Sequence, residues 1–374
     1  MAPTAAAAAA AADAPRRRRR DDPAAVARQL IDKEYDAICF DCDGVLWKGD
    51  ALVTPRVPAL LEQLRRRGVA YVFFTNNSLR SRADYAAKFA KLGLGAYVSA
   101  DQIYSSSYAA AAFLRRQEQE AAAAAVNSGG ENPRPPPAAR PPRRAYVVGG
   151  QGIIDELRLA GFDAFGGPED GDKRVDFAKE VVVEDNVFAV VVGVDPRLNY
   201  FKIHYAALCL LREPQGLCAF VACNEDGRGH FSPSQEWPGA GASVAAVAAV
   251  VGRPPDAVVG KPSTFLAGEV VRALRERRGG GKAGPRVLMV GDRLDTDVAW
   301  AHAAADEMMA AEGGNGGEGG GGGRRAMGAL LVMSGVATDA DLNAWPARAP
   351  EFVLGDVGEL ADALEAAAAA DASR

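Results

Sequence analysis

Short apolar runs alternate with amphipathic stretches along most of this chain. The runs have the length and composition of buried strands, and they occupy Tyr35–Phe40, Val69–Phe74, Ala145–Val148, Val187–Val194, Leu217–Ala222, Arg286–Val290, Ala329–Met333 and Phe352–Leu354. Stretches with helical spacing lie between many of them, at Arg80–Lys91, Arg197–Leu211 and Pro262–Arg278. Strands that alternate with helices are typical of βαβ units, so the pattern predicts an α/β fold on a mostly parallel sheet.

Three segments depart from this pattern. Residues 1–28 combine an alanine tract with Arg16–Arg20 and are predicted to form a disordered arm, with the ordered chain beginning near Ala25. Ala121–Arg144 is rich in alanine, proline and arginine, and Gly313–Gly323 is almost entirely glycine. Neither of these two can bury enough apolar surface to offset the entropy of ordering it, so both are predicted to be flexible excursions.

Composition narrows the class of protein. The 374 residues carry a formal net charge of -5, which disfavours nucleic acid as a partner because its binding needs a basic face. No charge-free apolar run is long enough to span a bilayer, so we expect no membrane partner. Five cysteines, without a disulfide-like spacing, are typical of a reducing compartment. We therefore expect a cytoplasmic protein, or a chloroplast protein if residues 1–28 are a transit peptide.

The strongest chemical signal is a pair of carboxylates at the end of the first apolar run. Asp41 and Asp43 follow Phe40, and Gly44 then allows a sharp turn. In open α/β sheets, ligands bind beyond the carboxyl ends of the strands. Two carboxylates this close repel each other, so the pKa of one of them rises unless a cation neutralises the pair. Mg2+ prefers such oxygen ligands. Taken alone, the motif is equally consistent with an ordinary turn.

Two further motifs carry groups suited to a phosphate. Thr75, Asn76 and Asn77 follow the second run and precede a helix, where hydroxyl and backbone N–H groups bind anions. Ordinary helix capping is the alternative explanation for them. Lys261 stands between an apolar pair and Pro262, which indicates either an ammonium positioned for a phosphate or carboxylate, or a solvated lysine.

More carboxylates follow the run that ends at Val290. Asp292, Asp295 and Asp297 stand there in the string GDRLDTD, and they offer a cation a ligand from a distant part of the chain. Asp295 also suits the start of a helix, where acidic residues are favoured. Because each of the four motifs lies at the end of a predicted strand, one crevice at the sheet edge can hold all of them.

The strings FDCDGVLW, FFTNNS, GKPS and GDRLDTD, in this order, closely resemble the haloacid dehalogenase superfamily of phosphatases, over roughly Tyr35 to Val357. Within it they look like the phosphoglycolate and pyridoxal phosphate phosphatase branch, and most like its plant and algal phosphoglycolate phosphatases. The resemblance implies a Rossmann-like, doubly wound parallel sheet as the catalytic core, with an inserted α/β cap domain. The core is expected at residues 29–117 and 255–374, and the cap at residues 118–254.

The resemblance also implies catalytic and metal-binding roles. Asp41 would be the nucleophile that forms an aspartyl-phosphate, and Asp43 would protonate the leaving alkoxide and later activate water. A Mg2+ cofactor would be held by Asp41, the backbone carbonyl of Asp43, and Asp292. Asp297 would support the metal from nearby, directly or through water.

The same resemblance implies the substrate-binding groups. Thr75, with the backbone of Asn76 and Asn77, would hold the phosphoryl group, and Lys261 would neutralise its charge. In the cap, His230 falls where this branch has a histidine that contacts substrate. An exposed loop histidine is the alternative for that position.

We expect this enzyme to hydrolyse a small phosphorylated metabolite, 2-phosphoglycolate first, with the role in photorespiration that the branch implies. A homodimer formed through the cap is the assembly that the resemblance suggests. Pyridoxal phosphate or a broad set of phosphomonoesters are alternative substrates. Hydrolysis of a carbon–halogen bond is disfavoured by Asp43, because that reaction needs no acid for an alkoxide. A non-catalytic scaffold is a remote further alternative.

Overall fold

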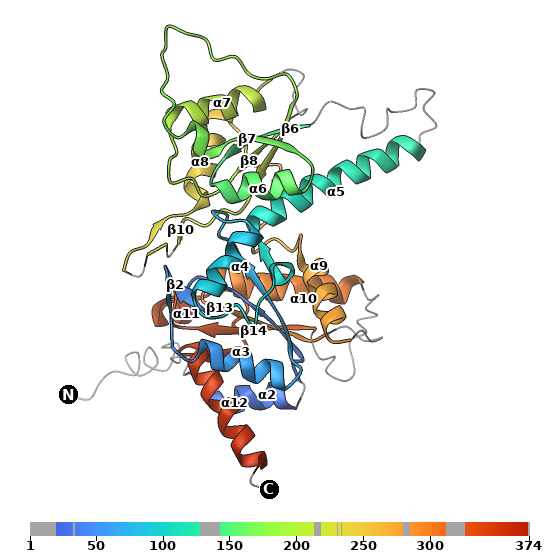
Figure 1. The fold of residues 1–374 in the computed structure, drawn as a ribbon, viewed down its shortest axis with the longest axis vertical. Coiled ribbons are helices and arrows are strands. Elements are labelled where there is room, and N and C mark those ends of the chain that lie inside the picture. Colours follow the sequence, from blue (N-terminus) through green and yellow to red (C-terminus); the bar gives the residue numbers. More distant parts are fainter. Residues whose placement is uncertain are drawn as a thin grey trace, which may run out of the picture.

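The computed structural model describes residues 20–32, 34–127, 143–212, 218–229, 231–232, 234–279, 285–311 and 326–372. These residues form two units, one above the other in Figure 1, and each is built around a parallel sheet with flanking helices. The expected α/β class is therefore confirmed. Among the residues described, no helix combines the length and apolar character that a membrane crossing needs.

The lower unit in Figure 1 contains a six-stranded parallel sheet in the order β15-β14-β13-β1-β4-β5. Its strands are β1 (Ala37–Phe40), β4 (Ala70–Thr75), β5 (Ile103–Ser105), β13 (Val287–Gly291), β14 (Met327–Val332) and β15 (Phe352–Leu354). The chain begins near the middle, extends the sheet on one side with β4 and β5, and returns to build the other side. β1 therefore lies at the switch point of the strand order, where such sheets bind ligands.

Alternating side chains give this sheet two apolar faces. Ile38 and Phe40 of β1 pack into one cluster, whereas Ala37 and Cys39 belong to the cluster on the other face. The first face is covered by α2 (Pro23–Ile31), α3 (Val57–Arg66), α4 (Arg82–Lys91) and α12 (Val357–Ala372). The second face is covered by α5 (Ser106–Asn127), α9 (Ala267–Arg277), α10 (Ala299–Ala311) and α11 (Asp339–Ala344).

The upper unit, inserted between β5 and α9, contains a five-stranded parallel sheet in the order β12-β9-β8-β6-β7. Its strands are β6 (Arg144–Val148), β7 (Asp163–Gly166), β8 (Val187–Val192), β9 (Ala219–Ala222) and β12 (Ala257–Val258), and its helices are α6 (Gln151–Leu159), α7 (Tyr200–Leu210) and α8 (Ala240–Val251). The structure also has two short hairpins, β2 (Trp47–Lys48) with β3 (Ala51–Leu52) and β10 (Arg228–Gly229) with β11 (Trp237–Pro238).

The expectation of a disordered arm over residues 1–28 is wrong for its last part, because α2 begins at Pro23. Asp22 caps this helix by accepting a hydrogen bond from the Ala24 N–H at 3.0 Å, and proline suits the first helical position. Val26 and Leu30 then bury the apolar side of the helix in the core. Residues 1–19 lie outside the described residues.

The upper unit ends later along the chain than expected. β12 pairs in parallel with β9, so the second sheet reaches Val258, beyond the expected end at residue 254. α5 continues to Asn127, through the start of the segment expected to be flexible, because its alanines favour a helix. Residues 128–142 and the glycine-rich segment lie outside the described residues. α9 begins at Ala267, so Pro262 lies in the preceding turn and not at a helix start.

Candidate active site

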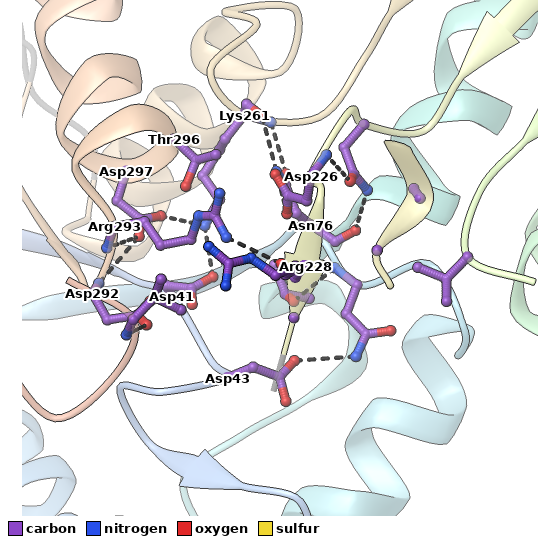
Figure 2. A pocket seen from close by; sticks show the side chains of 18 of the residues that line it. Asp41, Asp43, Asn76, Asp226, Arg228, Lys261, Asp292, Arg293, Thr296 and Asp297 are labelled. Carbon is purple, nitrogen blue, oxygen red and sulfur yellow. Dashed lines mark hydrogen bonds and ion pairs between the residues drawn. The ribbon is translucent and has the colours of Figure 1, made fainter. Parts of the chain in front are cut away.

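Adjacent strands of the core sheet bring the expected residues together at its carboxyl edge. β1 pairs with both β13 and β4. Asp41 follows β1, Asp292 follows β13 and Thr75 ends β4. These three side chains therefore line one pocket, together with Asp43 and Lys261 (Figure 2). The expectation that separate strand ends share one crevice is met by this geometry.

Lys261 is the centre of the site. Its ammonium group donates to Asp41 Oδ1 at 2.6 Å, to Asp297 Oδ1 at 2.7 Å and to the Phe74 carbonyl at 2.7 Å. Only 2% of the residue is exposed. Burial opposes the charge, but Asp297 and Asp41 outweigh burial and raise the pKa of Lys261 above its usual value. The lysine is therefore a fixed cation, and each of the three hydrogen atoms on its ammonium group is used in a hydrogen bond.

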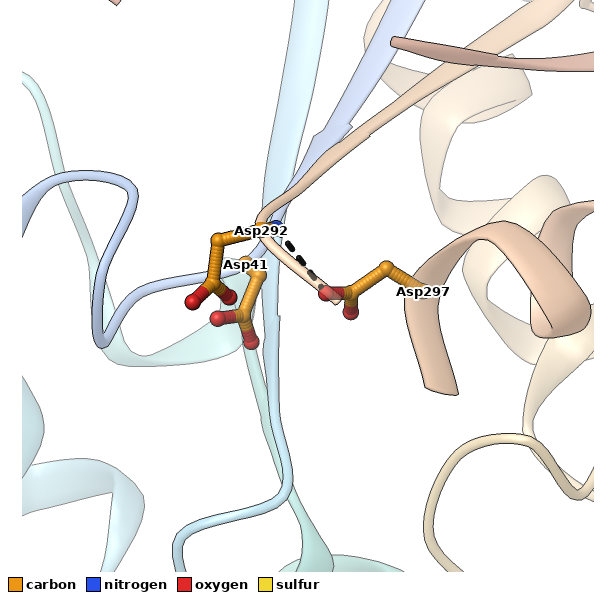
Figure 3. A group of neighbouring side chains, drawn as sticks. All are labelled: Asp41, Asp292 and Asp297. Atoms are coloured by element: carbon orange, nitrogen blue, oxygen red, sulfur yellow. Dashed lines mark hydrogen bonds between the residues drawn. The ribbon is translucent and has the colours of Figure 1, made fainter. Parts of the chain in front are cut away.

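Asp41, Asp292 and Asp297 form a buried carboxylate cluster in which one oxygen from each lies within 4.8 Å of the others (Figure 3). Asp297 Oδ2 accepts hydrogen bonds from the backbone N–H groups of Asp292 and Arg293, at 3.1 and 3.0 Å. Since its Oδ1 binds Lys261, both oxygens of Asp297 are engaged within the protein. Asp297 thus holds the lysine and the loop in place.

Asp292 is the member of the cluster that best fits a metal ion. Its Oδ2 accepts from the Val336 N–H at 2.7 Å, whereas its buried Oδ1 has no hydrogen-bond partner among the described residues. Burial, with repulsion from Asp297, raises the pKa of Asp292 to about 7. Burial also raises the pKa of Asp41 well above its usual value, despite Lys261. A hard divalent cation would offset the burial and mutual repulsion of these carboxylates. Their oxygen atoms therefore fit such an ion.

The turn after β1 packs tightly against this cluster. Gly44 has a φ of +88°, a conformation that residues other than glycine rarely adopt. A Cβ atom on Gly44 would lie 2.4 Å from Asp292 Oδ2. The glycine therefore lets the backbone turn sharply and approach Asp292, as the sequence predicts for a tight turn.

Asp43 lies on the opposite side of the pocket from the lysine cluster (Figure 2). The Trp47 indole N–H donates to Asp43 Oδ1 at 2.8 Å, and Asn77 Nδ2 donates to Asp43 Oδ2 at 3.2 Å. Asp43 therefore faces the pocket as a separate carboxylate, apart from the buried group around Lys261. This separation suits a proton donor better than a metal ligand for its side chain.

The side chains of the TNN string hold the site together. Asn76 accepts from the Lys261 N–H at 2.8 Å and donates to the Lys261 carbonyl at 2.9 Å, so it fixes the backbone of that lysine. Thr75 Oγ1 accepts from the Asn77 N–H at 3.1 Å. The side-chain amides of Asn76 and Asn77 and the Asn77 N–H are thus engaged with protein groups, while all three residues of the string line the pocket.

The upper unit lines the other part of the pocket. The contributing residues follow β8 and β9, belong to β10 and the loop after it, or stand at the start of α8, namely Val194, Asn224, Asp226, Arg228, Gly229, Phe231, Gly239 and Ala240. Asn76 donates to both oxygens of Asp226 at 3.2 Å, and the Arg293 guanidinium donates to the Arg228 carbonyl at 3.1 Å. His230, the expected cap histidine, lies outside the described residues.

Asp226 and Arg293 are site residues that were not expected from the sequence. Burial raises the pKa of Asp226, and the nearby Arg293 guanidinium opposes that rise. Arg293 also pairs with Asp295 at 2.7 Å. A signal for both was present, because Asp226 shares its loop with His230 and Arg293 stands inside the GDRLDTD string.

Two family models match the chain: a haloacid dehalogenase-like hydrolase over residues 38–163 and a HAD-hydrolase-like model over residues 258–314. Phosphoglycolate phosphatase 2 of Arabidopsis thaliana is 40% identical over 271 residues, which cover 72% of this chain and 80% of that protein. The chain belongs to the haloacid dehalogenase-like hydrolase family. Chronophin of Homo sapiens is 33% identical over 333 residues, covering 88% of this chain and 93% of chronophin.

A solved structure of the same fold supports this assignment. The 4-nitrophenylphosphatase of Thermotoga maritima has a TM-score of 0.62 and 26% identity, and the match covers 89% of this chain and 98% of that one. The expected haloacid dehalogenase-like family and the expected class of phosphoric monoester hydrolase are both confirmed by these relatives. Asp41 belongs to the first matched segment, and Lys261 and Asp292 belong to the second. The two matches together therefore contain the buried lysine and carboxylates of the site.

Proposed function

We propose that this chain is a Mg2+-dependent phosphatase that hydrolyses a small phosphate monoester, 2-phosphoglycolate foremost, through an aspartyl-phosphate on Asp41. The observation that carries the proposal is the buried group in which Lys261 Nζ lies 2.6 Å from Asp41 Oδ1, next to Asp292. Phosphoryl transfer depends mainly on positioning and on charge neutralisation. An anionic nucleophile beside a fixed cation supplies both.

The proposed reaction has two steps. A carboxylate oxygen of Asp41 attacks phosphorus, and the bond from phosphorus to the substrate oxygen breaks with its electron pair on that oxygen. Protonated Asp43 gives its proton to this oxygen, so the product leaves with a neutral hydroxyl group. Water then attacks the aspartyl-phosphate and gives a proton to the Asp43 carboxylate, which releases phosphate and restores Asp41. Lys261 neutralises the charge of the phosphoryl oxygens, and the Thr75 hydroxyl helps to hold them.

Asp41, Asp292 and the backbone carbonyl of Asp43 are the groups that would hold the Mg2+, with Asp297 in support. When bound, the ion supplies positive charge between an anionic nucleophile and an anionic substrate. Burial raises the pKa of Asp41, and a cation beside this carboxylate would favour its charged, nucleophilic form. Asp297 keeps Lys261 oriented toward Asp41 through its 2.7 Å contact.

The similarity to phosphoglycolate phosphatase 2 of Arabidopsis thaliana supports 2-phosphoglycolate as the first substrate to test. The chemistry of the pocket rim agrees with it, since Arg228 lines the pocket and its side chain is 74% exposed. A guanidinium is well suited to the carboxylate of such a substrate. The Arg228 guanidinium donates to Glu236, and the substrate carboxylate would replace Glu236 as its acceptor. A broader specificity is the second candidate, because the chain resembles a 4-nitrophenylphosphatase in fold.

The test is phosphate release from a panel of 2-phosphoglycolate, pyridoxal phosphate and 4-nitrophenyl phosphate, each with Mg2+ and with EDTA. We expect turnover of 2-phosphoglycolate with the highest kcat/KM, and its loss in EDTA. If another member of the panel ranked first, the proposed substrate would be wrong while the phosphatase activity stood. Turnover that persisted in EDTA would remove the metal from the proposal.

A further inference from the structure

Lys88 is a nearly buried lysine on α4 that the proposed reaction does not yet use. Its side chain is 9% exposed, although lysines are mostly exposed in proteins. Its Nζ lies 3.9 Å from Asp43 Oδ1 and 4.3 Å from the centre of the Trp47 ring. The Trp47 indole N–H donates to the same Asp43 oxygen at 2.8 Å. An ammonium group and an N–H donor therefore converge on one carboxylate oxygen.

Packing alone does not explain this lysine. Taking an ammonium group out of water costs free energy unless an anion lies close to it. Within the described part of the chain, Asp43 is the one carboxylate in ion-pair contact with Lys88. Burial lowers the pKa of Lys88, and the charge of Asp43 opposes that shift. By contrast, Lys91 on the same helix is 69% exposed and pairs with the exposed Asp50.

We propose that Lys88 is a positioning residue for Asp43, and that with Trp47 it stabilises the carboxylate that Asp43 becomes when its proton moves to the leaving oxygen. This inference deepens the proposed function and rests on it. In the transfer, the Asp43 O–H bond breaks, its electron pair stays on Asp43, and the proton bonds to the leaving oxygen. Negative charge thus grows beside Lys88 as the transition state is approached, so their attraction is stronger there than in the ground state.

The nature of the leaving group separates this role from a merely structural one. An alkoxide is a strong base and needs the proton of Asp43 as it leaves. A 4-nitrophenolate is a weak base and leaves with little help from an acid. Since kcat/KM reports the steps up to departure of the leaving group, the later attack of water on the aspartyl-phosphate does not enter it. Weakening Asp43 as an acid should therefore lower kcat/KM for an alkyl phosphate selectively.

The experiment compares kcat/KM for 4-nitrophenyl phosphate with kcat/KM for the alkyl phosphate that the wild type hydrolyses best, in the full-length protein with saturating Mg2+. The variants are Lys88→Met, which keeps the length of the side chain and removes its charge, and Lys88→Arg, which keeps the charge. Lys91→Met is the matched control on the same helix. The ratio of the two kcat/KM values does not depend on how much of the enzyme is folded.

We expect Lys88→Met to lower kcat/KM for the alkyl phosphate by about tenfold or more, part of the ~10²–10⁴-fold that a general acid contributes. The loss with 4-nitrophenyl phosphate should stay below about threefold. Lys88→Arg should restore most of the ratio, and Lys91→Met should leave it unchanged. A wild-type ratio in Lys88→Met, or an equal change in Lys91→Met, would overturn the inference alone. A wild type inactive on every phosphate monoester would overturn the proposed function, and this inference with it.

Discussion

The proposed chemistry requires a full negative charge on the oxygen of Asp41 that meets phosphorus. Asp41→Asn keeps the shape of the side chain and removes that charge, so we predict that phosphate release falls below detection. The fold should survive, because the amide also removes one of several buried carboxylates that repel each other. We therefore expect a melting temperature without metal that is close to that of the wild type. Phosphate release and thermal unfolding of the same preparations check both parts.

Asp50→Asn is a suitable control for that variant. Asp50 follows the same motif along the chain, but its side chain is 61% exposed, and within the described part of the chain its ion pair is the surface pair with Lys91. Asp50→Asn should keep full activity. Turnover in Asp41→Asn at even a tenth of the wild-type rate would mean that another group attacks phosphorus.

At the level of residues, the sequence indicates which groups meet but not how they are held. Asp41, Lys261 and Asp292 are predictable, because each stands just after an apolar run and the carboxyl ends of parallel strands share one edge. The clamp of Asn76 on the Lys261 backbone joins groups far apart in the chain, and no local pattern encodes it. The sequence does contain a signal for Lys88, because this lysine stands beside Phe89 on the side of the helix that is otherwise apolar.

At the level of elements, α4 links the upper unit to the catalytic loop. Glu156 of α6 is 1% exposed and accepts the backbone N–H of Arg82, at the start of α4, at 2.6 Å. Its other oxygen lies 3.3 Å from the Arg82 guanidinium. Gly152 permits this contact, because a Cβ there would lie 2.1 Å from the Arg80 backbone. A carboxylate at a helix N-terminus is favourable, so α6 stabilises α4 from outside.

We predict that Glu156→Ala lowers the free energy of unfolding by about 1–3 kcal/mol, because it leaves the partly buried Arg82 N–H without this partner. Glu156→Gln should cost less, since it keeps an oxygen that can accept this hydrogen bond. Asp155→Ala is the matched control on the same helix, where Asp155 accepts a hydrogen bond from Gln151 at the surface. Denaturant unfolding of the three variants measures which of them loses most free energy of unfolding. Equal losses in Glu156→Ala and Asp155→Ala would point to a general effect of helix substitution.

The strands marked by an apolar run follow from the sequence whatever their length, and the strands without such a run do not. β15 is found at its predicted bounds, and β1 lies inside its predicted run. β12 has only two residues, both half-buried, so the short apolar stretch before Lys261 does not predict it as a strand, and it is defined by its pairing with β9. α2 was missed because a short helix after an arginine-rich segment has little intrinsic stability. Its burial against the core decides its structure.

On the scale of the whole molecule, the buried carboxylate cluster should make the stability of the fold depend on pH and on a bound metal ion. A raised pKa means that the folded protein holds a proton more tightly than the unfolded chain does. For Asp292, the stability from this source is fully present below the unfolded value of 3.8 and is lost as the pH rises through about 7. The raised pKa of Asp41 acts in the same direction. Without metal, the protein should therefore melt at a lower temperature at about pH 8 than at about pH 6.

Mg2+ should remove this loss, because it binds the ionised cluster in the folded state only. An ion at 100 times its Kd adds about 2.7 kcal/mol, which corresponds to several degrees in melting temperature. The gain should shrink toward about pH 6, where protons compete for the same oxygens. Thermal unfolding at both pH values, with EDTA or with Mg2+, measures these effects. In Asp292→Asn both the pH dependence and the gain from Mg2+ should diminish. A metal-free wild type that grew more stable from about pH 6 to about pH 8 would show that these carboxylates ionise freely and that the buried cluster does not need a cation.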